Sequence, residues 1–304
     1  MNASCAQLLV QGEKELSSAG IESARTEAAI LLAYSLGIEY KTLLTRLTEP
    51  APQEAKEGFY RLLKQRIGHY PLQYLTGSQE FMSLKFEVNE NVLIPRWDTE
   101  RMVELVLEKL EDYEQPLVVD VGTGSGAIIV SLAKFFPRGK FFGLDISRPA
   151  LEVAVRNARR HGVADKITFI EGDLLAPFLS SPKYKPFGKE AAVGCLTKFP
   201  ESKFDFVISN PPYIPQGEID DLPSDVRREP SLALNGGEDG LAFYRRLIPE
   251  ACQVLHPGGH LFLEIGYNQS EAVSALCHSY GFAGARVFQD YARQDRFVYG
   301  RFQG

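Results

Sequence analysis

Residues 118–133, VVDVGTGSGAIIVSLA, decide the fold. A valine-rich run leads into three glycines, and an apolar stretch with helical periodicity follows. Glycines at such a junction let the backbone turn sharply and lie close to a ligand. The spacing of Gly122, Gly124 and Ala127 also fits the G-x-G-x-x-A pattern of dinucleotide sites. The stretch therefore predicts a strand, a ligand-binding loop and a helix, and by itself leaves a dinucleotide and a nucleoside ligand both open.

Around this stretch, strands alternate with helices from residue 98 onward. Strands are predicted in 116–122, 140–146, 166–173, 204–210 and 259–266. Helices are predicted in 99–110, 127–135, 149–161, 241–255 and 270–280, and two closing strands in 285–291 and 295–300. This alternation predicts an α/β, Rossmann-like fold with a parallel sheet covered by helices on both faces. Ligands in such folds bind beyond the carboxyl ends of the strands, so candidate residues are sought there.

The chain divides into three predicted domains. Residues 1–77 have helical periodicity and predict a small N-terminal helical domain. Residues 78–95 change to alternating apolar positions, which predicts a β-hairpin linker with its turn near residues 89–91. Residues 96–304 form the α/β domain. Within it, residues 177–203 are long and aperiodic for a connection, which predicts a surface insertion close to the ligand-facing rim.

The composition is that of a globular protein, with 44% apolar and 24% charged residues. A net charge of −6 argues against tight nonspecific binding to nucleic acid, which usually needs a basic domain. The four cysteines lack metal-ligand and redox spacing, which predicts reduced thiols and a cytoplasmic protein. We expect no signal peptide and no membrane span, because no basic start precedes an apolar run and no uncharged apolar stretch is long enough.

Two further polar patterns predict no site. His256 and His260 have a metal-like spacing, but HPGGH predicts a turn that does not aim both rings at one ion, so no metal is expected. The stretch RNARRH at 156–161 predicts a solvated helix face that adds a local basic patch.

Acidic residues stand at successive strand ends. Asp145 is placed to accept both hydroxyls of a ribose, and Asp173 to accept from an adenine amino group with Leu174 covering the ring. Each Asp could instead act only as a helix cap or turn former. Three strand ends that cradle a nucleoside resemble the S-adenosylmethionine-dependent methyltransferases of the Rossmann-like class. In that class the acid before the glycines, here Asp120, lies near the amino-acid end of the cofactor.

The fourth strand ends in Asn210-Pro211-Pro212-Tyr213. The prolines fix their own φ angles and push the preceding residues toward extended geometry. The side-chain carbonyl of Asn210 and the backbone carbonyl of Pro211 can then point at one spot, where two acceptors suit a planar NH₂ group, and Tyr213 can cover its face. An amide nitrogen is a poor nucleophile, and rigid placement against an electrophilic methyl lowers the barrier. We therefore expect direct in-line methyl transfer with late loss of the proton.

The wider resemblance covers the chain from about residue 20. It rests on HYPLQYLTGSQEF, VLIPRWDTE, VVDVGTGSGAI, SNPPYIP, EPSLALNGGEDGLAFYRRL, PGGHLFLEIGYNQ and DYARQDRFVYG, in this order. The chain resembles the bacterial peptide-chain release factor glutamine methyltransferases. The resemblance implies an enzyme that methylates the side-chain amide of the glutamine in the Gly-Gly-Gln motif of class 1 release factors. It implies S-adenosyl-L-methionine as cofactor, S-adenosyl-L-homocysteine as product, and a helical domain that docks the protein substrate.

The resemblance also implies roles for individual residues. The cofactor set is Asp120, Gly122, Thr123, Gly124, Ser125, Gly126, Asp145, Asp173, Leu174 and Asn210. The catalytic and glutamine-holding set is Asn210, Pro211, Pro212 and Tyr213, with Arg96 and Glu100 at the mouth of the site. Arg96 and Glu100 could instead form only an ion pair at a helix start. The chain departs from the family pattern at Trp97, where Pro is usual, and at Leu174, where an aromatic residue is frequent.

Other functions are weighed against this one. A relative of the family methylates a glutamine of a ribosomal protein, and a related reaction methylates adenine in nucleic acid. The negative net charge and the lack of a basic segment that could read a nucleic-acid target argue against methylation of adenine. A non-catalytic protein that binds a translation factor would not need an intact Asn-Pro-Pro-Tyr, and neither would a nicotinamide oxidoreductase. We expect release factors as partners, no stable nucleic acid and a monomer.

Overall fold

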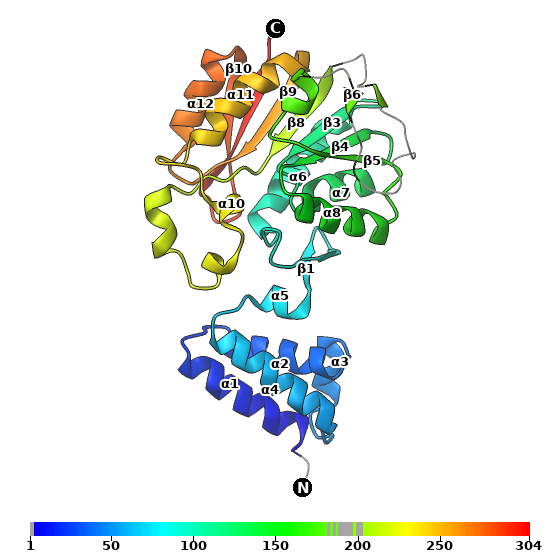
Figure 1. Cartoon of the computed structure of the whole chain (residues 1–304), viewed down its shortest axis with the longest axis vertical. Helices are drawn as coiled ribbons and strands as arrows, with labels where there is room; N and C mark the ends of the chain where they lie inside the picture. Colours follow the sequence, from blue (N-terminus) through cyan, green and yellow to red (C-terminus); the bar gives the residue numbers. More distant parts are fainter. Residues whose placement is uncertain (1–2, 181–182, 185–186, 188–196, 199–202) are drawn as a thin grey trace. The chain divides into compact units, whose positions relative to one another are not determined.

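The computed structural model describes residues 3–180, 183–184, 187, 197–198 and 203–304. The chain forms two compact units (Figure 1). One unit consists of Met1–Ser78 with the short segment Pro223–Arg228, and the other of Gln79–Leu222 with Glu229–Gly304. The first unit contains the N-terminal part of the chain together with six residues from its second half, Pro223–Arg228.

The N-terminal unit is helical, as predicted. Its helices are α1 (Cys5–Ser18), α2 (Ala24–Ser35), α3 (Tyr40–Thr45), α4 (Gln53–Ile67) and α5 (Leu72–Thr76). Leu8, Leu31 and Phe59 are fully buried among them. The buried Arg66 on α4 donates to Glu27 at 2.5 Å and lies 3.3 Å from Asp225. This ion-pair cluster ties the segment Pro223–Arg228 to the helices.

A seven-stranded sheet forms the centre of the second unit. In spatial order its strands are β10 (Phe282–Gln289), β11 (Asp295–Phe302), β9 (Leu255–Glu264), β8 (Phe204–Ser209), β3 (Leu117–Val121), β4 (Lys140–Asp145) and β5 (Ile167–Glu171). Strands β9, β8, β3, β4 and β5 are parallel, and β11 is antiparallel to both of its neighbours. The α/β fold class and the pairing of the two closing strands are confirmed.

Helices cover both faces of this sheet. On one face lie α6 (Trp97–Leu110), α7 (Ala127–Phe135) and α8 (Arg148–Arg160), and on the other α11 (Ala242–Val254) and α12 (Ser270–Ser279). Val118 belongs to the first apolar core and Val119 to the second, since successive side chains of a strand point to opposite faces. Both are fully buried, which explains the continuous apolar run of this strand.

The hairpin exists, but its predicted turn was wrong. It consists of β1 (Ser78–Phe81) and β2 (Leu84–Glu87), with Met82 and Ser83 between them at φ values of 52° and 58°. The backbone N–H of Met82 donates to Glu100 on α6 at 2.6 Å, so a tertiary contact holds a turn that the residue types disfavour. Asn89, expected in the turn, instead accepts from the N–H of Asn91 after the second strand.

The stretch 156–161 is also not a wholly solvated face. Arg156 is exposed and pairs with Glu87 at 2.8 Å, but Asn157 is fully buried. The Asn157 side chain accepts from the N–H of Glu87 and donates to the carbonyls of Glu87 and Ser125. A polar side chain that joins the hairpin, α8 and the glycine loop cannot be recognised from the charge pattern around it.

The remaining short elements are α9 (Ala176–Ser180), β6 (Lys183–Tyr184), β7 (Thr197–Lys198), the 3-10 turns η1 (Gln216–Asp221) and η2 (Val226–Arg228), and α10 (Ser231–Leu234). Strands β6 and β7 pair antiparallel. Most of the predicted insertion at 177–203 lies outside the described residues, so its position close to the ligand-facing rim stays a prediction. None of the helices that the structure describes has the length and hydropathy of a membrane span.

Candidate active site

A cavity of about 310 Å³ lies at the carboxyl ends of β3, β4, β5 and β8. The strand order reverses between β3 and β8, where Val121 pairs with Ser209, and such switch points are where α/β folds bind ligands. The predicted residues that line the cavity are Arg96, Gly122, Thr123, Gly124, Ser125, Asp145, Asp173, Leu174, Asn210, Pro211 and Pro212. Four other predicted residues do not belong to this lining: Asp120, Gly126, Tyr213 and Glu100.

The glycine loop makes one wall of the cavity. Gly122 has a φ of 74°, and apart from its chain neighbours no atom of the described residues lies within 4 Å of the place where a side chain would begin. The amide of Thr123 donates to the carbonyl of Leu144 at 2.8 Å, which fixes the loop to β4. Gly126 has a φ of 80° and packs so closely on Ala154 of α8 that an added Cβ would approach it to 3.1 Å. The glycines are thus required partly by the turn and partly by close packing.

Asp120 lies beneath this loop and is fully buried. Its Oδ2 accepts from the hydroxyl of Thr123 at 2.7 Å, whereas its Oδ1 is buried and has no hydrogen-bond partner among the residues that the structure describes. Burial raises the pKa of Asp120 to about 7. A buried oxygen without a partner beside a ligand cavity is a candidate acceptor for a donor group of that ligand.

Asp145 and Asp173 have different surroundings. Asp145 accepts from the amides of Gly124 and Ser147, both at 2.8 Å, and so is also the turn former that the sequence left open. A carboxylate has about four acceptor positions, so hydroxyl groups of a ligand can still bind. Asp173 forms an ion pair of 2.7 Å with Arg246, a cavity residue that the sequence did not single out. Leu174 is buried beside it at a φ of 49°.

The proline turn also lines the cavity, through Asn210, Pro211 and Pro212. Asn210 follows β8 and donates its Nδ2 to Thr99 Oγ1 at 3.3 Å. The Tyr213 side chain does not line the cavity, contrary to the expectation that it covers a bound amide. Its ring packs on the apolar core beneath the sheet, and burial raises its pKa to about 12. The backbone carbonyl of Tyr213 accepts from the side chain of the buried Gln269 at 2.9 Å, and this bond anchors the turn.

Arg96 and Glu100 do not pair with each other. Arg96 binds Glu229, a buried carboxylate that also accepts from the amide of Ile94 at 2.9 Å. Glu100 holds the hairpin through Met82 and does not reach the cavity. Trp97, the departure from the family pattern at the start of α6, is 73% exposed. The segment after Glu229 adds Pro230, Leu232 and Ala233 to the cavity wall.

Sequence reasoning missed several residues of the site. Thr99, Phe243 and Arg246 line the cavity. Glu229 binds the lining residue Arg96, and Glu264 binds Thr99. Phe243 and Arg246 are three positions apart on α11, a spacing that places them on one helix face and was a usable signal. Glu229 contacts Ile94, and Glu264 contacts Thr99. Each pair is more than 130 positions apart in the sequence, so no local pattern reveals these contacts.

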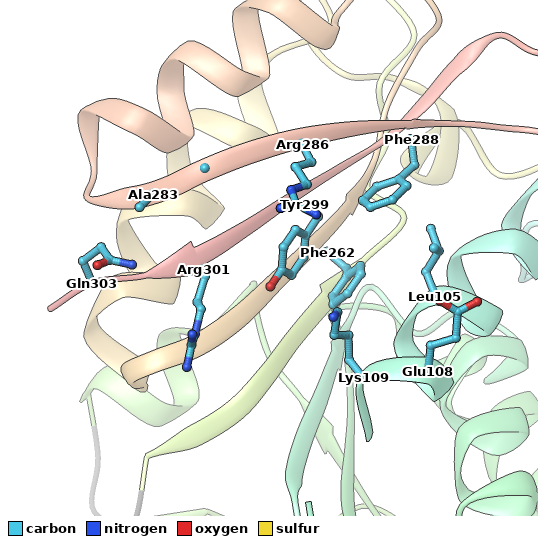
Figure 2. A pocket seen from close by; sticks show the side chains of 11 residues that line it. Leu105, Glu108, Lys109, Phe262, Ala283, Arg286, Phe288, Tyr299, Arg301 and Gln303 are labelled. Carbon is cyan, nitrogen blue, oxygen red and sulfur yellow. The ribbon is translucent and has the colours of Figure 1, made fainter. Parts of the chain in front are cut away.

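A second hollow of about 480 Å³ lies over α6, β9, β10 and β11. Figure 2 shows Phe262, Tyr299 and Phe288 inside it, with the basic side chains of Lys109, Arg286 and Arg301 around them. Its lining contains neither the glycine loop nor the proline turn, so it is not the predicted site.

The two histidines considered for a metal have other partners. His256 lies 2.8 Å from Asp205, and His260 lies between the hydroxyls of Tyr113 and Tyr299. No group of metal-ligating side chains occurs among the residues with described coordinates.

Comparisons with known proteins agree with this architecture. Residues 7–77 match a family described as PrmC N-terminal domain, and residues 116–290 match a methyltransferase domain family. A release factor glutamine methyltransferase from Moorella thermoacetica is 44% identical over 291 residues, which are 95% of each chain. One from Geobacter sulfurreducens is 38% identical over 94% of this chain and 92% of its own.

Among solved structures, the hMettl16 catalytic domain, in complex with MAT2A 3'UTR hairpin 6, has a TM-score of 0.54 at 15% identity. The match covers 80% of this chain and 81% of that chain, and it shows that the fold is shared. The glycine loop, the acidic strand ends and the proline turn thus stand in a chain whose sequence matches its relatives almost from end to end. The chain belongs to the family of release factor glutamine methyltransferases.

Proposed function

We propose that this protein transfers a methyl group from S-adenosyl-L-methionine to the side-chain amide nitrogen of the glutamine in the Gly-Gly-Gln motif of class 1 release factors. The observation that carries the proposal is that Asn210, Pro211 and Pro212 line the same cavity as the glycine loop. Family membership gives the substrate class. S-adenosyl-L-homocysteine is the second product.

The residues of the glycine side fit such a cofactor. The unpartnered Oδ1 of Asp120 suits the ammonium group of an amino acid, and the open space before Gly122 leaves room for a chain to pass. Asp145 has acceptor positions left for ribose hydroxyls, and Leu174 offers an apolar surface for a base. Thr123, Gly124, Ser125 and Gly126 shape the loop. When bound, the cofactor supplies an electrophilic methyl group on a sulfonium.

Asp173 has a competing partner. Because Arg246 already binds its carboxylate, we propose that this pair forms the edge of the base pocket and that Asp173 keeps one oxygen for an amino group. Leu174 covers the base by apolar contact where an aromatic residue would stack.

The chain's part in the reaction is to bind and orient the glutamine. Asn210 Oδ1 and the Pro211 carbonyl accept the two hydrogens of its amide, and the stiff backbone of Pro211 and Pro212 keeps both acceptors in place. Tyr213 contributes by anchoring the turn to the core, and Arg96, held by Glu229, lies at the mouth of the site. No side chain has to remove a proton before attack, because a methyl group on a sulfonium is a strong electrophile and the amide nitrogen is held in line with it. The nitrogen loses its proton to water after the new carbon–nitrogen bond has formed and the carbon–sulfur bond has broken.

The remaining partner assignments belong to the same proposal. The N-terminal helical unit, residues 1–77, docks the release factor, and the hairpin of 78–95 links it to the catalytic domain of 96–304. The protein acts as a monomer in the cytoplasm, where its substrate is used, and it holds no nucleic acid stably.

The direct test is methyl transfer from labelled S-adenosylmethionine to a purified release factor. We expect one methyl group per release factor, and none on a factor whose loop glutamine is replaced. Asn210→Ala should lower turnover by about 10²- to 10³-fold, as loss of one preorganised polar group does, while cofactor affinity changes only a few-fold. Arg286→Ala in the second hollow is the matched control and should leave turnover unchanged. Near-normal turnover of Asn210→Ala would refute the proposal.

A further inference from the structure

The carboxamide of Asn210 is held from behind by residues of two other elements. Its Nδ2 donates to Thr99 Oγ1 on α6 at 3.3 Å, and the same hydroxyl donates to Glu264 Oε2 at the end of β9 at 2.7 Å. Thr99 is 4% exposed and Glu264 is 1% exposed. The three side chains therefore form one hydrogen-bonded row that leads from the protein interior to the cavity wall.

The row has a direction. A hydroxyl carries one hydrogen, and Thr99 gives it to the carboxylate, which can only accept. The hydroxyl oxygen then has only lone pairs to offer to Asn210, and these suit the NH₂ end of the carboxamide and repel its carbonyl end. A flipped amide would bring Oδ1 of Asn210 against the lone pairs of Thr99. The ionised Glu264 thus selects one of the two orientations of the Asn210 amide.

Glu264 is itself firmly placed. Its backbone carbonyl accepts from the hydroxyl of Tyr244 at 2.8 Å. In the sheet, Glu264 of β9 is the strand partner of Phe297 of β11. Its neighbour Leu263 pairs with Ser209, which directly precedes Asn210. The strand that carries the carboxylate therefore lies beside the strand that carries the amide.

We propose that Thr99 and Glu264 are positioning residues that keep the NH₂ of Asn210 turned to the interior and its carbonyl oxygen free for the substrate. This inference rests on the proposed function, because the group that the oxygen accepts from is the glutamine amide. A carboxamide turned the other way would present two donors to a substrate NH₂ that also donates, and the glutamine would lose one of its two acceptors.

The row also couples the site to pH. Burial raises the pKa of Glu264 to about 7. The charged and titratable groups around its carboxylate are Arg296, Arg96 and Asp98, with the phenols of Tyr213 and Tyr244. A protonated Glu264 can donate to the hydroxyl oxygen of Thr99. The Thr99 hydroxyl can then donate its hydrogen to the side-chain carbonyl of Asn210, so neither orientation of the Asn210 amide is preferred. Turnover should therefore fall as the pH is lowered through the apparent pKa of Glu264 and be restored as it rises.

Three variants test the row. Thr99→Val keeps the shape and removes the hydroxyl, Thr99→Ser keeps the hydroxyl, and Glu264→Gln keeps the shape but can donate as well as accept. Ser131→Ala is the matched control, since Ser131 is a buried hydroxyl on α7 to which the described part of the chain offers no hydrogen-bond partner. We expect Thr99→Val and Glu264→Gln to lower kcat by about 10- to 100-fold with little change in cofactor affinity, and Thr99→Ser to stay within about threefold. The low-pH loss of kcat should be absent from Glu264→Gln.

A second readout is independent of activity. Hydrogen exchange of the Asn210 side-chain NH₂, followed by NMR in the ligand-free protein and assigned with Asn210→Ala, reports the bond to Thr99. Exchange should be at least about tenfold faster in Thr99→Val than in the wild type and Thr99→Ser. Wild-type kcat in Thr99→Val, or equal exchange in all variants, would overturn the inference. The two proposals can fail separately. If the Asn210 NH₂ of the wild-type protein exchanged slowly but the protein methylated no release factor, the hydrogen-bonded row would be supported and the proposed function refuted.

Discussion

At the scale of single residues, Gly240 shows how tightly the proline turn is held. It has a φ of 75°, and an added Cβ would lie 2.4 Å from the carbonyl oxygen of Tyr213 and 2.5 Å from Nε2 of Gln269. Gly240→Ala should therefore displace the turn and its anchor. We expect a loss of about 2 kcal/mol or more in the free energy of unfolding and a clear loss of turnover.

The control for backbone strain alone is Gly162→Ala. Gly162 has a φ of 70° but open space around it, so its substitution should cost only about 1 kcal/mol and spare turnover. Urea unfolding and methyl-transfer rates of both variants check this prediction. Equal effects of the two substitutions would mean that close packing at Gly240 does not position the turn.

Asp120 gives the ligand-free protein a defined pH response. Its pKa is about 7 when folded, because of burial, and near 4 when unfolded. A raised folded pKa adds stability that is fully present below about pH 4 and is lost as the pH rises to about 7, because the unfolded chain releases its proton first. Between pH 5 and 7.5, Asp120→Asn should flatten this fall by at most about 3 kcal/mol. Urea unfolding of both proteins at pH 5 and 7.5 measures it, and an unchanged slope would contradict the assigned environment.

At the scale of elements, Asn157 joins three pieces of structure. Its side chain, on α8, forms hydrogen bonds with the backbone N–H and carbonyl of Glu87 in β2. It also donates to the carbonyl of Ser125 in the glycine loop. Asn157→Ala leaves these buried groups unpaired and should cost about 2–4 kcal/mol of stability. It should also weaken cofactor binding, because Ser125 lines the cavity.

The neighbouring Arg156 supplies the matched control. Its exposed ion pair with Glu87 should contribute less than about 1 kcal/mol, so Arg156→Ala should leave cofactor affinity unchanged. Thermal unfolding and calorimetric titration with S-adenosylhomocysteine compare the two. If Arg156→Ala weakened the binding as much as Asn157→Ala, the bond to Ser125 would not be what shapes the loop.

The elements themselves were largely predictable, since buried strands and amphipathic helices have strong periodicity. Helix α7 begins and ends where the pattern predicts, at Ala127 and Phe135. The position of the hairpin turn was not predictable, because Glu100 fixes Met82 and Ser83 in conformations that their residue types disfavour. The cavity walls were predicted from glycines, prolines and strand-end acids, which act locally. The residues behind the walls, such as Glu264, act across long separations and leave no local signal.

At the scale of the whole molecule, the N-terminal unit carries its own hollow. It measures about 420 Å³, lies over α2 and α4, and is lined by Tyr34, Leu36, Arg61 and Leu62 among others. Tyr34 is 50% exposed, and half-exposed aromatic residues at hollows are typical anchors for protein partners. If this unit docks the release factor, Tyr34→Ala should raise KM for the intact factor by about 5- to 30-fold. It should leave cofactor affinity and kcat unchanged.

Two comparisons make this prediction specific. A short peptide that contains the Gly-Gly-Gln sequence lacks the rest of the factor, so its methylation should not respond to Tyr34→Ala. Val10→Ala, an exposed apolar change on α1 outside the hollow, should affect neither substrate. Steady-state kinetics with both substrates decide the matter, and an equal response of peptide and factor would argue against a docking role.

The central claim is that two carbonyl oxygens of the proline turn hold a glutamine amide in line with the cofactor. The most direct measurement is a crystal structure of the protein with S-adenosylhomocysteine and a release factor. The account predicts Asn210 Oδ1 and the Pro211 carbonyl oxygen within about 3.2 Å of the amide nitrogen of the loop glutamine, which faces the cofactor sulfur. A complex in which these oxygens point away from the glutamine, or in which another group approaches the sulfur, would contradict it.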